Sequence, residues 1–192
     1  MKNHLRYFSM TSIYLSPEIK KVCEKKAHDA EKNPNYTRVP LRTKVKLIKN
    51  LIMEADMRGH KIICDEADSA QYQPEEGNPG PNPIEVFLSG YAFCFVVTMA
   101  KNAAIRELSL DSVEMDAKSI TDRAGYYLGI GDRSIISIDS DVHLVSTESR
   151  ETISDLIKIT EERCPASQTL SKATKLTYRY YLNEQELIPS SN

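Results

Sequence analysis

The sequence of residues 84–106 is IEVFLSGYAFCFVVTMAKNAAIR, the longest apolar stretch of the 192-residue chain. Apolar side chains point in nearly every direction around a helix of this sequence, so the pattern predicts one long helix that is buried on most sides. Its length of about 23 residues approaches that of a membrane span, but Glu85, Lys101, Asn102 and the polar sequence around the stretch favour a central core helix. The rest of the chain is therefore expected to fold around this helix.

The start of the helix is predicted from the sequence Asn82-Pro83-Ile84-Glu85. Asparagine suits the N-cap, proline starts a helix readily, and a glutamate at the third helical position completes a capping box. Along an ideal helix the nine steps from Glu85 to Cys94 leave the two side chains on roughly opposite faces. Glu85 is therefore interpreted first as a cap and second as a catalytic carboxylate.

Strand patterns precede the helix. Val45 and Leu47 alternate with lysines, which predicts a strand with one buried and one wet face, and Ile48 directly after Leu47 indicates a bulge or the end of the strand. The sequence Asp56-Met57-Arg58-Gly59 is a turn signal, and a returning strand is expected over residues 61–65. Residues 66–83 are expected to form a long loop.

Strand patterns also follow the helix. They cover residues 108–117, 134–145 and 175–182, with a bend or loop over residues 125–131. A second helix, capped by Ser149, is expected to bury a stripe of Ile153, Leu156, Ile157 and Thr160. Runs of strands separated by single helices predict an α+β fold, with an antiparallel or mixed sheet wrapped on the helices.

The length, net charge and cysteine content of the chain limit the class of protein to which it can belong. A chain of 192 residues supports one sizeable core, which we assign to residues 37–183, between an N-terminal helical extension (1–36) and a loose C-terminal tail (184–192). The net charge of -2 gives no electrostatic footprint for nucleic acid or an anionic membrane. Four cysteines are too few for a secreted disulfide scaffold, and the first residues lack a secretory signal pattern. A cytoplasmic protein with reduced or reactive thiols is expected.

Two cysteines are the candidate chemical groups. Pro165 places Cys164 at the N-cap of a short helix, where unpaired N–H groups favour a thiolate, although Cys164 also continues the apolar stripe of the preceding helix. Cys94 lies in the most apolar segment, where a free cysteine is commonly a small core residue. A thiolate at Cys94 would need a nearby cation, because burial raises the pKa of a thiol.

Two motifs contain these cysteines. Residues 80–94 are GPNPIEVFLSGYAFC, and residues 164–170 are CPASQTL, which begin 70 residues after Cys94. Together the motifs resemble the osmotically inducible protein C superfamily, which includes the organic hydroperoxide resistance proteins. The resemblance covers about residues 37–183. It implies an intertwined homodimer in which two central helices are buried side by side with the sheets outside, so that the partner covers the second face of the apolar helix.

The resemblance also implies a thiol-dependent peroxidase that acts on organic, fatty-acid-type hydroperoxides. The cysteine matching Cys94 becomes a sulfenic acid, the cysteine matching Cys164 condenses with it to a disulfide, and a lipoyl-type or thioredoxin-like dithiol restores both. Tyr91 and Phe95 are expected to contribute to an apolar substrate site. No cofactor or metal is expected, since the sequence has no Cys-x-x-Cys or paired histidine motif.

Two positions differ from, or only partly match, the family pattern. A family arginine in the turn before the second strand usually helps to hold the thiolate; Arg58 is the nearest match, and its alternative is a solvated turn residue. The family's glutamate directly follows the proline of the Asn-Pro motif, whereas this chain has Ile84 there and Glu85 one residue later. This shift favours the alternative function, a non-enzymatic dimeric module that binds a hydrophobic ligand or senses redox state.

Overall fold

The computed structural model describes residues 13–66, 78–131 and 135–187. These residues divide into two compact units, one within Lys26–Tyr91 and the other within Met1–Lys25 and Ala92–Asn192. Helix α3 (Pro83–Ile105) begins in the first unit and ends in the second. The α+β prediction is confirmed, with one antiparallel sheet and one mixed sheet. Residues 67–77 of the expected long loop lie outside the described residues.

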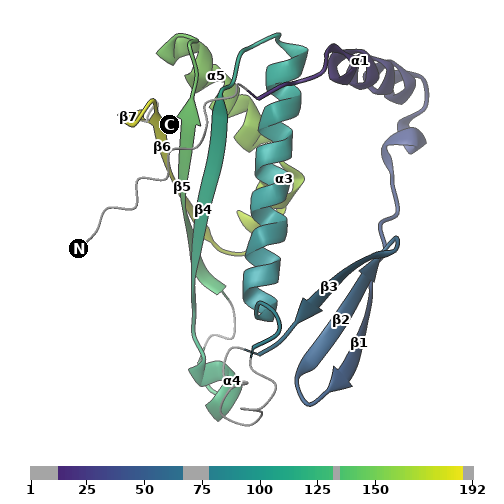
Figure 1. Ribbon diagram of the computed structural model, residues 1–192, viewed down its shortest axis with the longest axis vertical. Helices are drawn as coiled ribbons and strands as arrows, with labels where there is room; N and C mark the ends of the chain where they lie inside the picture. Colours follow the sequence, from purple (N-terminus) through teal and green to yellow (C-terminus); the bar gives the residue numbers. More distant parts are fainter. Residues whose placement is uncertain (1–12, 67–77, 132–134, 188–192) are drawn as a thin grey trace. The chain divides into compact units, whose positions relative to one another are not determined.

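The unit within Lys26–Tyr91 contains a three-stranded antiparallel meander (Figure 1). The pairing of β1 with β2 shifts register between Leu47 and Lys49, where the sequence predicted a bulge or the end of the strand. The predicted turn is a two-residue hairpin turn in which Arg58 and Gly59 have positive φ angles of 59° and 87°. The elements are η1 (Pro34–Thr37), β1 (Lys44–Lys49), β2 (Ile52–Met57) and β3 (His60–Cys64).

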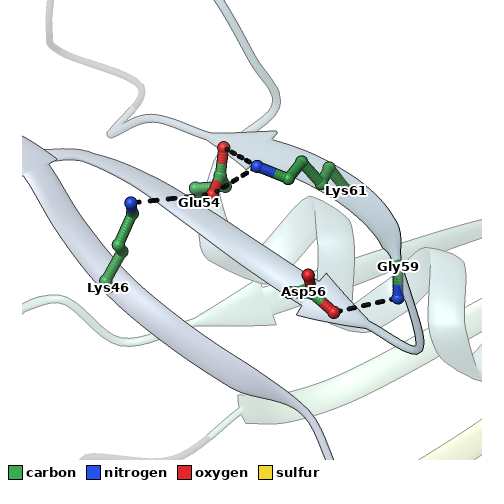
Figure 2. Close-up of polar contacts among 5 residues, drawn as sticks. All are labelled: Lys46, Glu54, Asp56, Gly59 and Lys61. Atoms are coloured by element: carbon green, nitrogen blue, oxygen red, sulfur yellow. Dashed lines mark hydrogen bonds and ion pairs between the residues drawn. The ribbon is translucent and has the colours of Figure 1, made fainter.

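The two faces of this meander differ in chemistry. On the polar face, Glu54 of β2 lies between Lys46 of β1 and Lys61 of β3, with N···O distances of 3.9 and 3.1 Å (Figure 2). The other face carries Val45 and Leu47, and both side chains are exposed. The predicted alternation is therefore confirmed, but the prediction that one face is buried is wrong within a single chain. These are apolar side chains that no other part of the described chain covers.

The second unit is built on a four-stranded sheet of order β4-β5-β6-β7. β5 and β6 pair in parallel, and the connection between them contains α5 and α6, which makes the sheet mixed. Two expectations are wrong in part: a short helix ends at Leu128 within the bend or loop expected over 125–131, and residues 185–187 of the tail expected to be loose form β7. The elements are β4 (Ser112–Thr121), α4 (Ala124–Leu128), β5 (Ile135–Val145), α5 (Arg150–Arg163), α6 (Pro165–Leu170), β6 (Lys175–Leu182) and β7 (Gln185–Leu187).

The core of this unit lies between the sheet and the helices. The predicted stripe of α5 is buried, and Ser149 caps that helix by accepting the N–H of Thr152. Helix α3 contributes Phe95, Met99 and Ala103 to the same core. The core also contains residues of α5 and of the sheet, namely Val142, Leu144, Ile153, Leu156, Ile157, Tyr180, Leu182 and Leu187.

The N-terminal extension forms the predicted helix, α1 (Pro17–Lys32), and the Glu18 N–H donates to the Ser16 hydroxyl at its start. The segment just before α1 belongs to the second unit. The N–H of Ile13 donates to the carbonyl of Leu110, and Leu15 packs against the core. This part of the extension is therefore attached to the main fold rather than separate from it.

Helix α3 departs from its prediction in one respect. Phe95 and Met99 are fully buried, but Phe93 on another face is 73% exposed and Val97 is 47% exposed. The expectation that the helix is buried on most sides is therefore wrong within one chain. Among the described residues it is the one helix long and apolar enough to cross a membrane by length and composition, a property that core helices of globular proteins share.

Candidate functional site

The structure brings the two predicted cysteines together. The Sγ atoms of Cys94 and Cys164 are 3.7 Å apart, although the residues are 70 positions apart in sequence. Cys164 is fully buried, whereas Cys94 is half-buried and so the more accessible of the two. Both are free thiols. A small movement would bring the sulfurs to the bonding distance of about 2.05 Å.

The short helix α6 sets the surroundings of the pair. Cys164 is its N-cap and Pro165 its first residue, as the Cys-Pro sequence predicts. The Cys164 side chain makes no capping hydrogen bond. The free N–H of Ala166 instead donates to the sulfur of Cys94. The N–H of Ala166 at the start of α6 thus lowers the pKa of Cys94, and the thiolate expected at Cys164 stays a prediction.

Opposing effects act on the thiol of Cys94. Burial is the largest and raises the pKa of Cys94 above its ordinary value, and the neighbouring Cys164 raises the pKa further. The Ala166 N–H and the positive charge of Lys101 lower the pKa of Cys94. Lys101 follows Cys94 by two helical turns, so both side chains leave α3 on nearly the same face. Lys101 is thus a cation on the Cys94 face of α3 that was not predicted from the sequence, and its effect on the Cys94 pKa is the smallest of those named.

Arg58, the cation that was assigned, belongs to the other compact unit. It occupies the hairpin turn between β2 and β3 with an exposed side chain, and the N–H of the next residue, Gly59, donates to the carboxylate of Asp56 (Figure 2). Its role at the thiolate stays a prediction.

Glu85 forms the capping box. Its Oε2 accepts the N–H of Asn82 at 2.8 Å, and Oδ1 of Asn82 accepts the N–H groups of Ile84 and Glu85, both at 2.9 Å. The reciprocal pattern is the one predicted from the sequence. The catalytic role of Glu85 stays a prediction, and the contact that the structure gives its carboxylate is the cap.

The two residues expected to contact a substrate are buried. Tyr91 is almost fully enclosed, and the ring of Phe95 stacks on that of Tyr178 with centroids 5.5 Å apart. In contrast, Phe93 directly precedes Cys94, Val97 follows it by three residues, and both are exposed. Contact of a substrate with Tyr91 and Phe95 therefore stays a prediction, and the apolar side chains open to solvent beside the cysteine are different ones.

Residues that the sequence reasoning missed hold the junction between α5 and α6. The hydroxyl of Tyr178 donates to Ser167 at 3.0 Å, and the hydroxyl of Tyr180 donates to the carboxylate of Glu161. The side chain of Gln168 donates to the carbonyl of Glu161 at 3.0 Å. Burial raises the pKa of Glu161, while the hydrogen bond from Tyr180 lowers it. These contacts tie the residues on both sides of Cys164 to β6 and to each other.

No group of three or more histidine, cysteine or acidic side chains lies close enough to hold a metal ion within residues 13–66, 78–131 and 135–187. The structure places two thiols and the backbone N–H of Ala166 at the cysteine pair, with Lys101 on nearly the same face of α3 as Cys94.

The comparisons with known proteins agree with this arrangement. The family model described as OsmC-like protein matches residues 75–179, which contain both cysteines. The chain belongs to the OsmC-like protein family. This OsmC-like chain is 30% identical over 100 residues to a hydroperoxide reductase of Mycoplasma genitalium, covering 51% of this chain and 67% of that relative.

Solved structures show the same fold for this OsmC-like chain. An OsmC-like protein from Mycoplasma pneumoniae superposes with a TM-score of 0.66 at 21% identity, covering 76% of this chain and 99% of the other. The organic hydroperoxide resistance protein OhrB of Bacillus subtilis superposes with a TM-score of 0.53 at 19% identity, covering 72% and 97%. These similarities confirm the α+β fold that the family resemblance implied.

Proposed function

We propose that this OsmC-like protein is a thiol-dependent peroxidase that reduces organic hydroperoxides to alcohols. The observation that carries the proposal is the 3.7 Å separation of the Cys94 and Cys164 sulfurs. The relative named hydroperoxide reductase supports the same activity. Cys94 is the proposed peroxidatic residue, since it is the more accessible sulfur and accepts the Ala166 N–H. Cys164, fully enclosed behind it, is the proposed resolving residue.

The proposed reaction balances in three steps. The Cys94 thiolate attacks the terminal oxygen of the hydroperoxide; an S–O bond forms, the O–O bond breaks, and the alkoxide takes a proton to become the alcohol. The sulfur of Cys164 then attacks the Cys94 sulfenic acid, which forms the disulfide and releases water. An external dithiol, lipoyl-type or thioredoxin-like, reduces this disulfide to two thiols and is itself oxidised to a disulfide. A reducing compartment such as the cytoplasm suits this cycle.

A homodimer is part of the proposal. Phe93 and Val97 expose apolar surface on α3, and Val45 and Leu47 expose apolar surface on β1. Solvent exposure of this kind is unfavourable, and a second copy of the chain would cover it. The exposed Phe93 and Val97 near the thiol would then become walls of an apolar entrance, which favours alkyl and fatty-acid hydroperoxides over hydrogen peroxide. Tyr91 and Phe95 are proposed to form the deeper part of that surface.

Arg58 is proposed as a further cation for the Cys94 thiolate. The support for this role is the family resemblance, because the hairpin turn itself accounts for the positive φ of 59° at Arg58. The variant Arg58→Asn is a sharp test, because asparagine suits this hairpin position better than arginine does. If Arg58 serves catalysis, Arg58→Asn keeps or gains thermal stability and loses rate of thiol oxidation. Equal rates in Arg58→Asn and wild type would remove Arg58 from the mechanism.

The activity is tested by peroxide kinetics of three proteins: wild type, Cys94→Ser and Cys164→Ser. Wild type is expected to consume cumene hydroperoxide with dithiothreitol or dihydrolipoamide as reductant, and Cys94→Ser is expected to be inactive. Cys164→Ser is expected to form a stable sulfenic acid at Cys94, detectable by dimedone labelling and mass spectrometry. Full activity of Cys94→Ser would overturn the proposal.

A redox sensor is the second candidate. The observation that favours it is the shifted glutamate: Ile84 occupies the position that follows the proline, and the carboxylate of Glu85 accepts the N–H of Asn82 in the capping box. A sensor forms the same disulfide but turns over poorly. If steady-state turnover is much slower than the first oxidation with every reductant tried, the result favours the sensor over the enzyme.

A further inference from the structure

A closed ring of contacts joins the two cysteines through three other residues. On α3 the hydroxyl of Thr98 donates to the carbonyl of Cys94 at 2.7 Å. The amide nitrogen of Asn102 donates to the carbonyl of Thr98 at 2.8 Å. Nη1 of Arg163 donates to Oδ1 of Asn102 at 3.1 Å, and Arg163 directly precedes Cys164. The sulfur of Cys164 closes the ring at 3.7 Å from that of Cys94.

Asn102 is the central member of this polar ring. Asn102 is only 5% exposed and lies in a mostly apolar helix. A buried amide is costly unless it is hydrogen-bonded at both ends. A carbonyl can only accept and a guanidinium can only donate, so the amide can serve Thr98 and Arg163 in one orientation alone. The hydrogen-bonding capacity of the two partner groups and the observed distances therefore both assign the amide oxygen of Asn102 to Arg163.

Arg163 is the last residue of α5, at the point where the chain must bring Cys164 to α3. The N–H of Cys164 still bonds to the carbonyl of Thr160 at 2.9 Å, so the position of the Cys164 backbone follows that of the helix end. An exposed ion pair would hold this end weakly. A charged donor on a buried, fixed amide holds it better, because hydrogen bonds to charged groups are among the stronger ones.

We propose that Asn102 and Arg163 are positioning residues for the disulfide step. Their hydrogen bond holds the end of α5 against α3 and thereby keeps the sulfur of Cys164 within reach of Cys94. The inference rests on the proposed function, since a resolving step is what such positioning serves. The quantity that the hydrogen bond raises is the effective concentration of one thiol at the other.

The test is the thiol–disulfide equilibrium of the Cys94–Cys164 pair in dithiothreitol buffers, measured on the full chain without peroxide. Asn102→Leu removes the acceptor and Arg163→Met removes the donor. Each is expected to lower the equilibrium constant for disulfide formation about tenfold, as for one hydrogen bond to a charged group. For this two-electron couple a tenfold change corresponds to about 30 mV. The double variant is expected to lose no more than either single variant, because both remove the same contact.

Two control variants separate positioning from general damage. Asn102→Asp keeps an acceptor for Arg163 but loses the donor to the Thr98 carbonyl, and it is expected to lie closer to wild type than Asn102→Leu, because a charge-assisted bond to Arg163 remains. Lys158→Met makes the same charge change as Arg163→Met on the same helix and is expected to leave the equilibrium unchanged. If Asn102→Leu fails to fold, the comparison of Arg163→Met with Lys158→Met decides the question, because both side chains are exposed.

The outcomes for the two proposals are distinguishable. An equilibrium constant for Arg163→Met equal to that of Lys158→Met, or a loss in Asn102→Asp as large as in Asn102→Leu, would overturn the positioning role. The proteins could instead show the predicted equilibrium and variant effects while wild type loses no thiol to cumene hydroperoxide. This result would overturn the peroxidase proposal and leave the positioning of the two thiols intact.

Discussion

Replacing Lys101 with methionine should slow the oxidation of Cys94 by an amount that depends on salt. Lys101 lies two helical turns beyond Cys94 on nearly the same face, which corresponds to a rise of about 10 Å along the helix. At this distance, and with an effective dielectric constant of about 40, two unit charges interact by about 0.8 kcal/mol before screening. Screening reduces this to about 0.6 kcal/mol at 0.01 M ionic strength and to about 0.2 kcal/mol at 0.15 M.

These energies convert directly to thiolate populations. Lys101 lowers the pKa of Cys94, so Lys101→Met should raise that pKa and reduce the fraction of thiolate at neutral pH. The rate of thiol loss at pH 7 should fall about threefold at 0.01 M salt and about 1.5-fold at 0.15 M. At a pH well above the pKa of Cys94 the two proteins should react at the same rate, because the thiol is then fully ionised in both.

The assay is stopped-flow measurement of single-turnover thiol oxidation by cumene hydroperoxide, as a function of pH at both salt concentrations. Lys101→Arg serves as the charge-conserving control and Lys158→Met as the control for loss of a surface charge elsewhere. A rate deficit of Lys101→Met that is the same at both salt concentrations, or that persists at high pH, would refute an electrostatic role for Lys101.

Three further predictions concern stability and assembly. Gly80→Ala should destabilise the fold by about 1–3 kcal/mol in urea denaturation, because the added Cβ would lie 2.4 Å from the backbone oxygen of Ile63; a loss below 0.5 kcal/mol would contradict this contact. Phe93→Glu should give a monomer by light scattering at micromolar concentration where wild type is a dimer, and a monomeric wild type would contradict the proposed interface. The pKa of Glu161 is raised by burial, so the folded state binds the extra proton and stability should fall as pH rises from about 4 through that pKa. Glu161→Gln should flatten this dependence in urea midpoints measured from pH 4 to pH 7, and an unchanged slope would count against it.

The parts of the fold that the sequence predicts are those that depend on local periodicity. The stripe ending at Thr160 has helical spacing, and Asn82 with Glu85 forms a cap from groups three residues apart, so neither needs knowledge of the rest of the chain. Strand β7 was missed because it has three residues with a single apolar one, Leu187, and its pairing with β6 is what orders it. Helix α4 was missed because it is a single turn ended by Gly129 in the left-handed region.

Burial was harder to predict than secondary structure. Val45 and Phe93 have the hydrophobicity of core residues, yet both are exposed in the single chain. Hydrophobic periodicity predicts which face of a helix or strand is apolar. It does not indicate whether the same chain or a second copy of the chain covers that face. A partner subunit is therefore the natural explanation for apolar side chains that the described chain leaves uncovered.

The candidate site was predictable only in part. The two motifs identified Cys94 and Cys164 jointly, whereas the contact of Asn102 with Arg163 joins side chains 61 residues apart and needs the folded structure. A signal for it was nevertheless present. Thr98 and Asn102 follow Cys94 at intervals of four, which makes a polar line on one face of an apolar helix.

The most direct test of the central claim is identification of the bond formed when the reduced protein reacts with one equivalent of cumene hydroperoxide. The account predicts the loss of two thiols per chain and one disulfide, found by non-reducing peptide mapping to join Cys94 to Cys164 within a single chain. Thiols that remain intact at stoichiometric peroxide, or a disulfide that involves Cys23 or Cys64 in place of this pair, would contradict it.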